Sequence, residues 1–314
     1  MKTSVVKNTK DTITSAHVKP NSLWKEMKKY KIAYVFMLPA ILLISFFMLI
    51  PLCHSIIMSF YRWDGITTPT FNGLSNYTHL LTNNHFWKAA FNNLKFLVLF
   101  TALTVILGFV FAVAIDRRMK GWRIYKFVFF IPFMLVTAAL GILFAQIYEP
   151  SHGILNTFLG SIGLESLQQL WLGDSNITLY SIIAVAIWQL SGWTMILYLA
   201  AIEGIDNQVH DAATIDGVTE WQRMFHIIAP MVKRITYMII LLQIIASLKT
   251  FDLIWVMTKG GPFYASEVLG TILYRTAFEQ QQFGYASAVA VLMTIIVMSI
   301  TLIYLKYSKL SEQE

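Results

Sequence analysis

The chain has 314 residues, of which 56% are hydrophobic and 13% are charged. An average globular domain has roughly 25% charged residues, so this composition excludes an ordinary soluble enzyme domain and a disordered chain. The net charge of +7 suits either a nucleic-acid partner or a membrane protein whose basic residues gather on one side. The single cysteine, Cys53, excludes an intrachain disulfide framework.

Long apolar stretches almost free of charge predict six transmembrane helices. A hydrocarbon core about 30 Å thick needs about 20 apolar residues in a helix, whereas membrane strands would need alternating polarity. A helix also satisfies its own backbone hydrogen bonds in lipid. We therefore predict an all-α integral membrane protein, and the six spans are 32–61, 96–115, 127–148, 175–202, 235–257 and 280–305.

The positions of lysine and arginine predict the orientation of these spans. Most of the 24 basic residues lie before the first span, between the second and third, between the fourth and fifth, and after the sixth. The segment 149–176 has neither lysine nor arginine. Both termini are therefore expected in the cytoplasm, and the basic excess is a topology signal, with no nucleic-acid partner expected.

The predicted domains follow from the spans. They are a cytoplasmic N-terminal tail at 1–31, a six-helix transmembrane domain at 32–305 that contains a cytoplasmic loop at 203–230, and a cytoplasmic C-terminal tail at 306–314. The polar residues 1–22 predict disorder. Residues 23–31 predict either a short amphipathic helix on the membrane surface or a simple charged flank.

Sequence signals of catalysis are missing. No Gly-Lys dipeptide occurs, so the chain lacks a phosphate-binding P-loop and cannot hydrolyse ATP by that route. No Cys or His pair has metal-ligand spacing, and no G-x-S-x-G presents a nucleophile. We therefore predict no catalytic residue and no metal or other cofactor. Lys249 and Asp252, the charged residues of the fifth span, either snorkel or pair at the membrane interface, or line a substrate path.

The segment between the fourth and fifth spans carries the signals of two short helices. Asp206 or Asn207 can cap the first helix, and Gly217 is a natural left-handed residue to end it. Thr219 can cap the second, and Pro230 bends the chain into the fifth span. The residues alone leave two interpretations open: an element that docks a partner protein, or an amphipathic connector that lies on lipid.

This segment resembles the "EAA" loop of permease subunits of binding-protein-dependent ABC transporters, which reads roughly E-A-A, a spacer, Gly, a second spacer and I-x-L-P. Asp211 stands for the usual Glu, and Ala229 for the usual Leu. In that family a cytoplasmic ATPase subunit holds the loop in a surface cleft. The resemblance therefore implies a set of ATPase-coupling residues: Asp211, Ala212, Ala213, Asp216, Gly217 and Pro230.

The resemblance extends from about residue 30 to 305 and is to the carbohydrate-type subfamily, the first membrane subunit of maltose-like and glycerol-phosphate-like importers. It is carried by the stretches 38–40, 60–65, 71–77, 92–94, 130–132, 171–174, 257–262 and 283–288. It implies the type I ABC importer permease fold in a bacterial-type cell membrane. The implied partners are membrane lipid, a second homologous permease subunit, two ATPase subunits that bind ATP and Mg, and an extracytoplasmic sugar-binding protein.

A sugar site needs amide and hydroxyl groups beside an aromatic surface. Trp188 and Gln189 of the fourth span, and Gln243 and Ser247 on one face of the fifth, are our candidates for the substrate pathway. The polar face of the fifth span can also serve hydrogen bonds between helices. Alignment with the maltose-type sugar site, which the resemblance implies, lands on Ala186, Gln189, Leu190, Gln243 and Ser247.

The sequence thus predicts a permease subunit of an ATP-driven, binding-protein-dependent sugar importer. It would form half of the translocation pathway and couple to the ATPase through residues 206–230, without being an enzyme itself. Two other classes stay open. A self-contained channel or ion-coupled carrier would transport without ATP, and an intramembrane enzyme would need a polar catalytic group of residues within a helix.

Overall fold

The computed structural model describes residues 31–116 and 121–311. The predictions for 1–22 and 23–31 therefore lie outside the described residues, apart from Lys31. The chain divides into two compact units, Met1–His54 and Ser55–Glu314. The described residues are mostly helical, and within them the one sheet pairs β1 (Tyr61–Arg62) with β2 (Thr70–Phe71) in antiparallel register.

The described part of the first unit is one apolar helical stretch. It comprises α2 (Lys31–Ile44), the π-helical η1 (Ser45–Leu49) and the start of α3 (Ile50–Met58). An 18-residue window within 35–58 has a mean hydropathy of 2.6, and large side chains such as Phe36 and Phe47 are more than half exposed. A helix that is apolar all round and exposed within its own chain suits a lipid environment. This agrees with the first predicted span.

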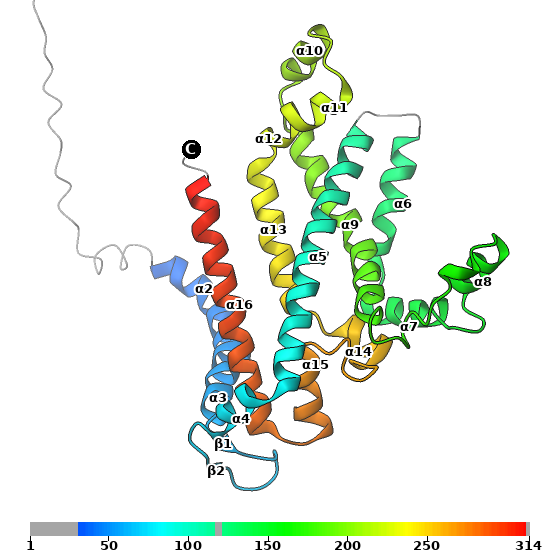
Figure 1. The fold of residues 1–314 in the computed structure, drawn as a ribbon. Helices are drawn as coiled ribbons and strands as arrows, with labels where there is room; N and C mark the ends of the chain where they lie inside the picture. The colour runs from blue at the N-terminus through cyan, green and yellow to red at the C-terminus, as the bar shows by residue number, and fades with distance from the viewer. Residues whose placement is uncertain (1–30, 117–120, 312–314) are drawn as a thin grey trace, which may run out of the picture. The chain divides into compact units, whose positions relative to one another are not determined.

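The core of the second unit is built on two long helices, α5 (Asn84–Asp116) and α9 (Thr178–Glu203), which lie side by side (Figure 1). Gly108 of α5 allows this close approach, because a β-carbon there would collide with the side chain of Thr194 on α9. Both α6 (Trp122–Met134) and α13 (Lys233–Leu248) pack against this pair. α9 is the most deeply buried of the long helices and forms the centre of the unit.

The third predicted span is broken near its middle. α6 ends at Met134, and α7 (Thr137–Ile147) leaves it at an angle of 99°. Pro132 lies in the last turn of α6, and Leu135 and Val136 are extended. A proline weakens the hydrogen bonding of a helix interior, so the turn at this point has a local cause. The prediction of one continuous helix over 127–148 was wrong, because an apolar composition does not report helix continuity.

The fifth predicted span is broken too. α13 ends at Leu248, and α14 (Asp252–Thr258) begins after three residues, so the prediction of one helix over 235–257 was also wrong. Among the described residues, four continuous helices are long and apolar enough to cross a membrane. The number reaches six if each of two bent helix pairs counts as one span. The predicted all-α membrane fold is confirmed.

The other elements of the second unit are short, except for the last helix. They are α4 (Ser75–Thr82), α8 (Ile154–Ser161), η2 (Glu165–Leu167), α10 (Asn207–Ile215), α11 (Glu220–Gln222), η3 (Arg223–Ile228), α12 (Ala229–Met231), α15 (Leu269–Tyr274), η4 (Arg275–Glu279) and α16 (Phe283–Ser311). Within this unit, α10 and α11 lie at one end, and α15 and the two strands lie at the other (Figure 1).

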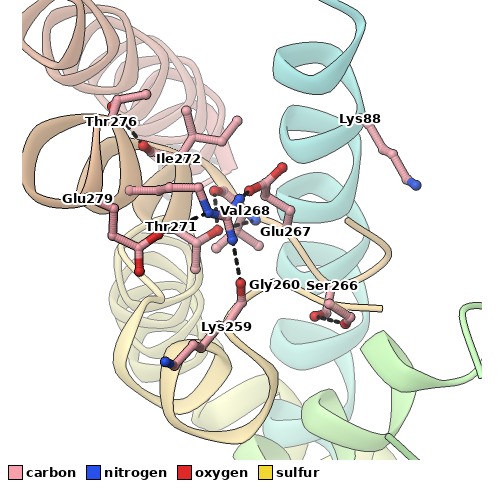
Figure 2. A network of polar contacts seen from close by, with 12 residues as sticks. Lys88, Lys259, Gly260, Ser266, Glu267, Val268, Thr271, Ile272, Thr276 and Glu279 are labelled. Carbon is pink, nitrogen blue, oxygen red and sulfur yellow. Dashed lines mark hydrogen bonds and ion pairs between the residues drawn. The ribbon is translucent and has the colours of Figure 1, made fainter. Parts of the chain in front are cut away.

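A polar network holds the segment between α14 and α15 (Figure 2). The buried Glu267 carboxylate forms an ion pair with Arg275, which also donates a hydrogen bond of 2.6 Å to the carbonyl of Lys259. Asn92 of α5 donates to the carbonyl of Glu267 at 2.9 Å. Burial raises the pKa of the Glu267 carboxyl, and the Arg275 charge opposes that shift. The network therefore fixes this segment to both α5 and η4.

Candidate functional site

The loop between α9 and α13 begins with a well-capped helix, α10. The Asp206 side chain accepts a hydrogen bond of 2.9 Å from the backbone N–H of Gln208. Gly217 ends the helix in the left-handed region with φ of 65°, and the N–H of Val218 bonds back to the carbonyl of Ala213. The predicted first helix and its glycine turn are confirmed.

A second helical segment follows this turn. Thr219 and Gln222 form a reciprocal capping box at its start, in which the Thr219 N–H donates to Gln222 Oε1 at 2.9 Å. The helical segment then runs through α11, η3 and α12, which contains Pro230, and meets α13 at an angle of 74°. The prediction that Thr219 caps a second helix is confirmed.

Most of the residues expected to contact an ATPase lie on the surface of this loop. Ala213 is the exception, because it lies on the buried face of α10 with 6% of its surface exposed. Two large apolar side chains, Ile215 at 85% and Trp221 at 69%, are also exposed. The exposed members of the expected set are Asp211, Ala212, Asp216, Gly217 and Pro230.

The base of the loop is anchored to the long helices. Arg223 of η3 forms an ion pair with Asp116, the last residue of α5, at 3.0 Å. Met224 and Ile228 of η3 are buried in a cluster that includes Ile202 of α9. The sequence analysis missed the ion pair, because its partners lie 107 residues apart. The exposed α10 is thus connected through a buried base to α5, α9 and α13.

A cavity of about 200 Å³ lies deeper in the second unit, between α5, α7, α9 and the break that separates α13 from α14. Its wall combines aromatic and apolar side chains with hydroxyl, amide and charged groups. The lining residues are Phe96, Phe100, Thr137, Ala186, Gln189, Leu190, Ala246, Lys249, Thr250, Phe251, Asp252 and Leu253. Such a mixture can hold a polar molecule that also has apolar faces.

Gln189 connects this cavity with the α6–α7 break. Its side chain is 5% exposed, and Nε2 donates to the carbonyl of Leu135 at 3.2 Å and to Thr137 Oγ1 at 3.3 Å. Backbone groups released by a broken helix at membrane depth need such a partner or a water-filled cavity. The break between α13 and α14, at Lys249–Phe251, borders the same cavity. Two helix breaks therefore meet at one polar site.

The other three candidates for the pathway lie elsewhere. Gln243 and Ser247 are fully buried within the helix packing. Gln243 Nε2 donates to Thr194 Oγ1 of α9 at 2.8 Å, and the carbonyl of Ser247 accepts a bond of 3.4 Å from Asn93 of α5. Trp188 is 45% exposed, and its ring packs against Phe144 of α7. Of the four candidates for the substrate pathway, Gln189 is the one that lines the cavity.

The described residues hold no group of three or more His, Cys, Asp or Glu side chains that could bind a metal ion. Lys249 and Asp252 both line the cavity, and the part of the chain that the structure describes contains no ion pair between them. From the sequence alone, these two residues either snorkel or pair at the membrane interface, or line a substrate path.

Comparison with known proteins gives concordant matches. Residues 105–311 match the family model described as binding-protein-dependent transport system inner membrane component. The chain is 33% identical over 286 residues to the probable ABC transporter permease protein YurN of Bacillus subtilis (strain 168), covering 90% of this chain and 98% of that relative. It is 27% identical over 292 residues to the trehalose/maltose transport system permease protein MalF of Thermococcus litoralis, covering 92% and 98%.

Solved structures with a similar fold include the bacterial alginate ABC transporter in complex with an alginate pentasaccharide-bound periplasmic protein. The TM-score is 0.78 at 22% sequence identity, and the match covers 90% of this chain and 95% of that chain. This likeness confirms the importer permease fold that the resemblance implied.

Proposed function

We propose that this chain, which belongs to the family of binding-protein-dependent transport system inner membrane components, is the permease subunit of an ATP-driven carbohydrate importer. It forms half of the translocation pathway and is not an ATPase itself. It pairs with a second, homologous permease subunit and with two ATPase subunits that bind ATP and Mg. An external sugar-binding protein delivers the substrate.

The observation that carries this proposal is the mechanical connection between the exposed loop and the cavity. Asp116 holds the base of the loop through Arg223, and it ends the same helix, α5, that contributes Phe96 and Phe100 to the cavity wall. α13 follows the loop directly and contributes Ala246. A force applied by a partner to α10 can therefore reach two walls of the cavity through buried contacts, which couples a partner's motion to the site.

In this proposal Asp211, Ala212, Asp216, Gly217 and Pro230 contact the ATPase or shape the loop that contacts it, and the buried Ala213 supports α10. Gln189 lies in the substrate path. Gln243 and Ser247 hold α13 against α9 and α5 beside the path, and Trp188 supports α7. The termini and the 206–230 loop lie in the cytoplasm of a bacterial-type cell.

The class of substrate is supported by the relatives. The Thermococcus litoralis relative is named for trehalose and maltose transport, and the structural neighbour was solved with an alginate pentasaccharide on its periplasmic protein. The cavity wall, with three phenylalanines beside amide and hydroxyl groups, is chemically suited to a sugar ring. An oligosaccharide or a related carbohydrate is therefore the proposed cargo.

The test is purification of the intact complex, followed by reconstitution into liposomes. Copurification of a second permease and an ATPase is expected, and uptake of the sugar that the external protein binds should require ATP inside the vesicle. A ligand screen on that external protein supplies the sugar. Transport by this chain alone, without ATP, would instead identify a channel or carrier. Turnover of a substrate without transport would identify an enzyme.

A further inference from the structure

We propose that Lys249 and Asp252 are specificity-determining residues, which contact the cargo directly and select an uncharged, polyhydroxylated sugar over an acidic one. The inference rests on the proposed function, because it assigns a substrate class to the same cavity. It starts from the position of the two side chains in the wall, beside Gln189 and Thr137.

The break between α13 and α14 brings charged side chains to the cavity. α13 ends at Leu248, the Lys249 N–H makes a last helical bond to the carbonyl of Ile245, and the next helix starts at Asp252. Irregular backbone is tolerated within a membrane protein where it is covered by protein or lines a water-filled cavity. Lys249 and Thr250, both in the cavity wall, belong to this irregular segment. Lys249 and Asp252 are both exposed on the chain, and the break places them in the wall of the cavity.

Other residues of the wall supply the rest of a sugar site. Gln189 and Thr137 lie on α9 and α7, Phe96 and Phe100 of α5 add aromatic surface, and so does Phe251, which lies between the two charged residues. The structure brings polar groups from three separate elements to one cavity of about 200 Å³. Convergence of this kind is typical of a binding site.

The pair of charges then decides the class of sugar. A carboxylate accepts hydrogen bonds from hydroxyl groups, and an ammonium group donates to hydroxyl oxygens, and both bonds are strengthened by the charge. Because one charge is positive and the other negative, the pair has no net charge. A uronic-acid carboxylate would be attracted by Lys249 and repelled by Asp252, and would lose its hydration on entering. A neutral sugar can satisfy both groups without that penalty.

The experiment measures binding to the detergent-purified complex, without the external binding protein, by saturation-transfer NMR. The probes are four neutral trisaccharides (maltotriose, cellotriose, raffinose and xylotriose) and one acidic trisaccharide, trigalacturonate. At least one neutral probe is expected to bind, and trigalacturonate is not. Asp252→Asn and Lys249→Gln should each raise the dissociation constant of the neutral probe about tenfold. This is the loss expected for one charge-assisted hydrogen bond. Lys306→Gln, an exposed lysine on α16, is the matched control and should bind normally.

Asp252→Asn gives a second readout that a purely structural role would not change. Removing the negative charge leaves Lys249 alone, so binding of trigalacturonate should rise relative to the neutral probe. The inference is overturned if the unaltered complex binds trigalacturonate as well as the best neutral probe, if no neutral probe binds, or if both variants bind unchanged. Each of these results can occur in a complex whose uptake is ATP-driven. A failure of this inference therefore does not contradict the proposed function, which the reconstitution experiment tests on its own.

Discussion

At the scale of single residues, Gln189 has two tasks at once. It lies in the cavity wall, and its amide also binds the backbone carbonyl and the hydroxyl on either side of the α6–α7 break. A side chain with both roles couples the shape of the site to the position of α7. Gln243 is a useful contrast, since its Nε2 donates to Thr194 within the helix packing and not to a group at the cavity.

We expect Gln189→Leu to impair both stability and transport. The carbonyl of Leu135 and the hydroxyl of Thr137 would lose their part-buried bonds to Gln189, and a hydrogen bond of this kind contributes about 0.5–1.5 kcal/mol. The thermal unfolding midpoint of the purified complex should fall, and the KM for sugar uptake should rise. Gln146→Leu, an exposed residue of α7, is the control and should change neither quantity. Normal uptake by the Gln189 variant would contradict a place in the substrate path.

At the scale of elements, the loop between α9 and α13 combines an exposed tip with an anchored base. The tip depends on the left-handed turn at Gly217, and the base depends on the Arg223–Asp116 ion pair and the buried Ile228. Nothing lies within 4 Å of a β-carbon added at Gly217, so the restriction there comes from backbone conformation and not from crowding. The turn sets the angle between α10 and the segment that leads into α13.

Gly217→Val should therefore uncouple ATP hydrolysis from uptake. The left-handed region costs an ordinary residue about 1–2 kcal/mol and is especially unfavourable for a β-branched one, so the turn and the direction of α10 should change. The ratio of ATP hydrolysed to sugar imported, measured in liposomes, should rise. Gly217→Asn is the matched control, because asparagine tolerates this conformation. Equal coupling in the two variants would show that the turn conformation is not what matters.

At the scale of the whole molecule, the charge distribution and the position of the loop lead to one orientation. The basic residues gather in the segments expected in the cytoplasm, among them the loop that contains α10. The segment 149–176, which has no basic residue and contains α8, is expected on the outside. In the proposed orientation α10 would face a cytoplasmic ATPase and α8 would face the exterior.

Cysteine labelling tests this orientation in intact cells. In a Cys53→Ser background, Ser161→Cys of α8 should react with a membrane-impermeant maleimide added outside. Gln208→Cys of α10 should react after the membrane is permeabilised and not before. Both positions are exposed, so access to water is not limiting. The reverse pattern of labelling would invert the topology and remove the coupling role of the loop.

The sequence by itself determined the membrane class, the approximate spans, the caps of α10 and the family. These signals are local: hydropathy over about 20 residues, a capping side chain such as Asp206, and a glycine such as Gly217 that suits a left-handed turn. The prediction of helix–turn–helix at 206–230 held for this reason.

Only the tertiary structure decided where the spans break and which polar residues face the cavity. Helical periodicity places Gln243 and Ser247 on one face, but it cannot tell whether that face meets another helix or an open space. The neighbouring α9 and α5 settle this by burying both residues, while the break after α13 turns Lys249 and Asp252 into the cavity wall. The Asp116–Arg223 pair joins residues 107 apart, and a contact of that range depends on how the helices pack.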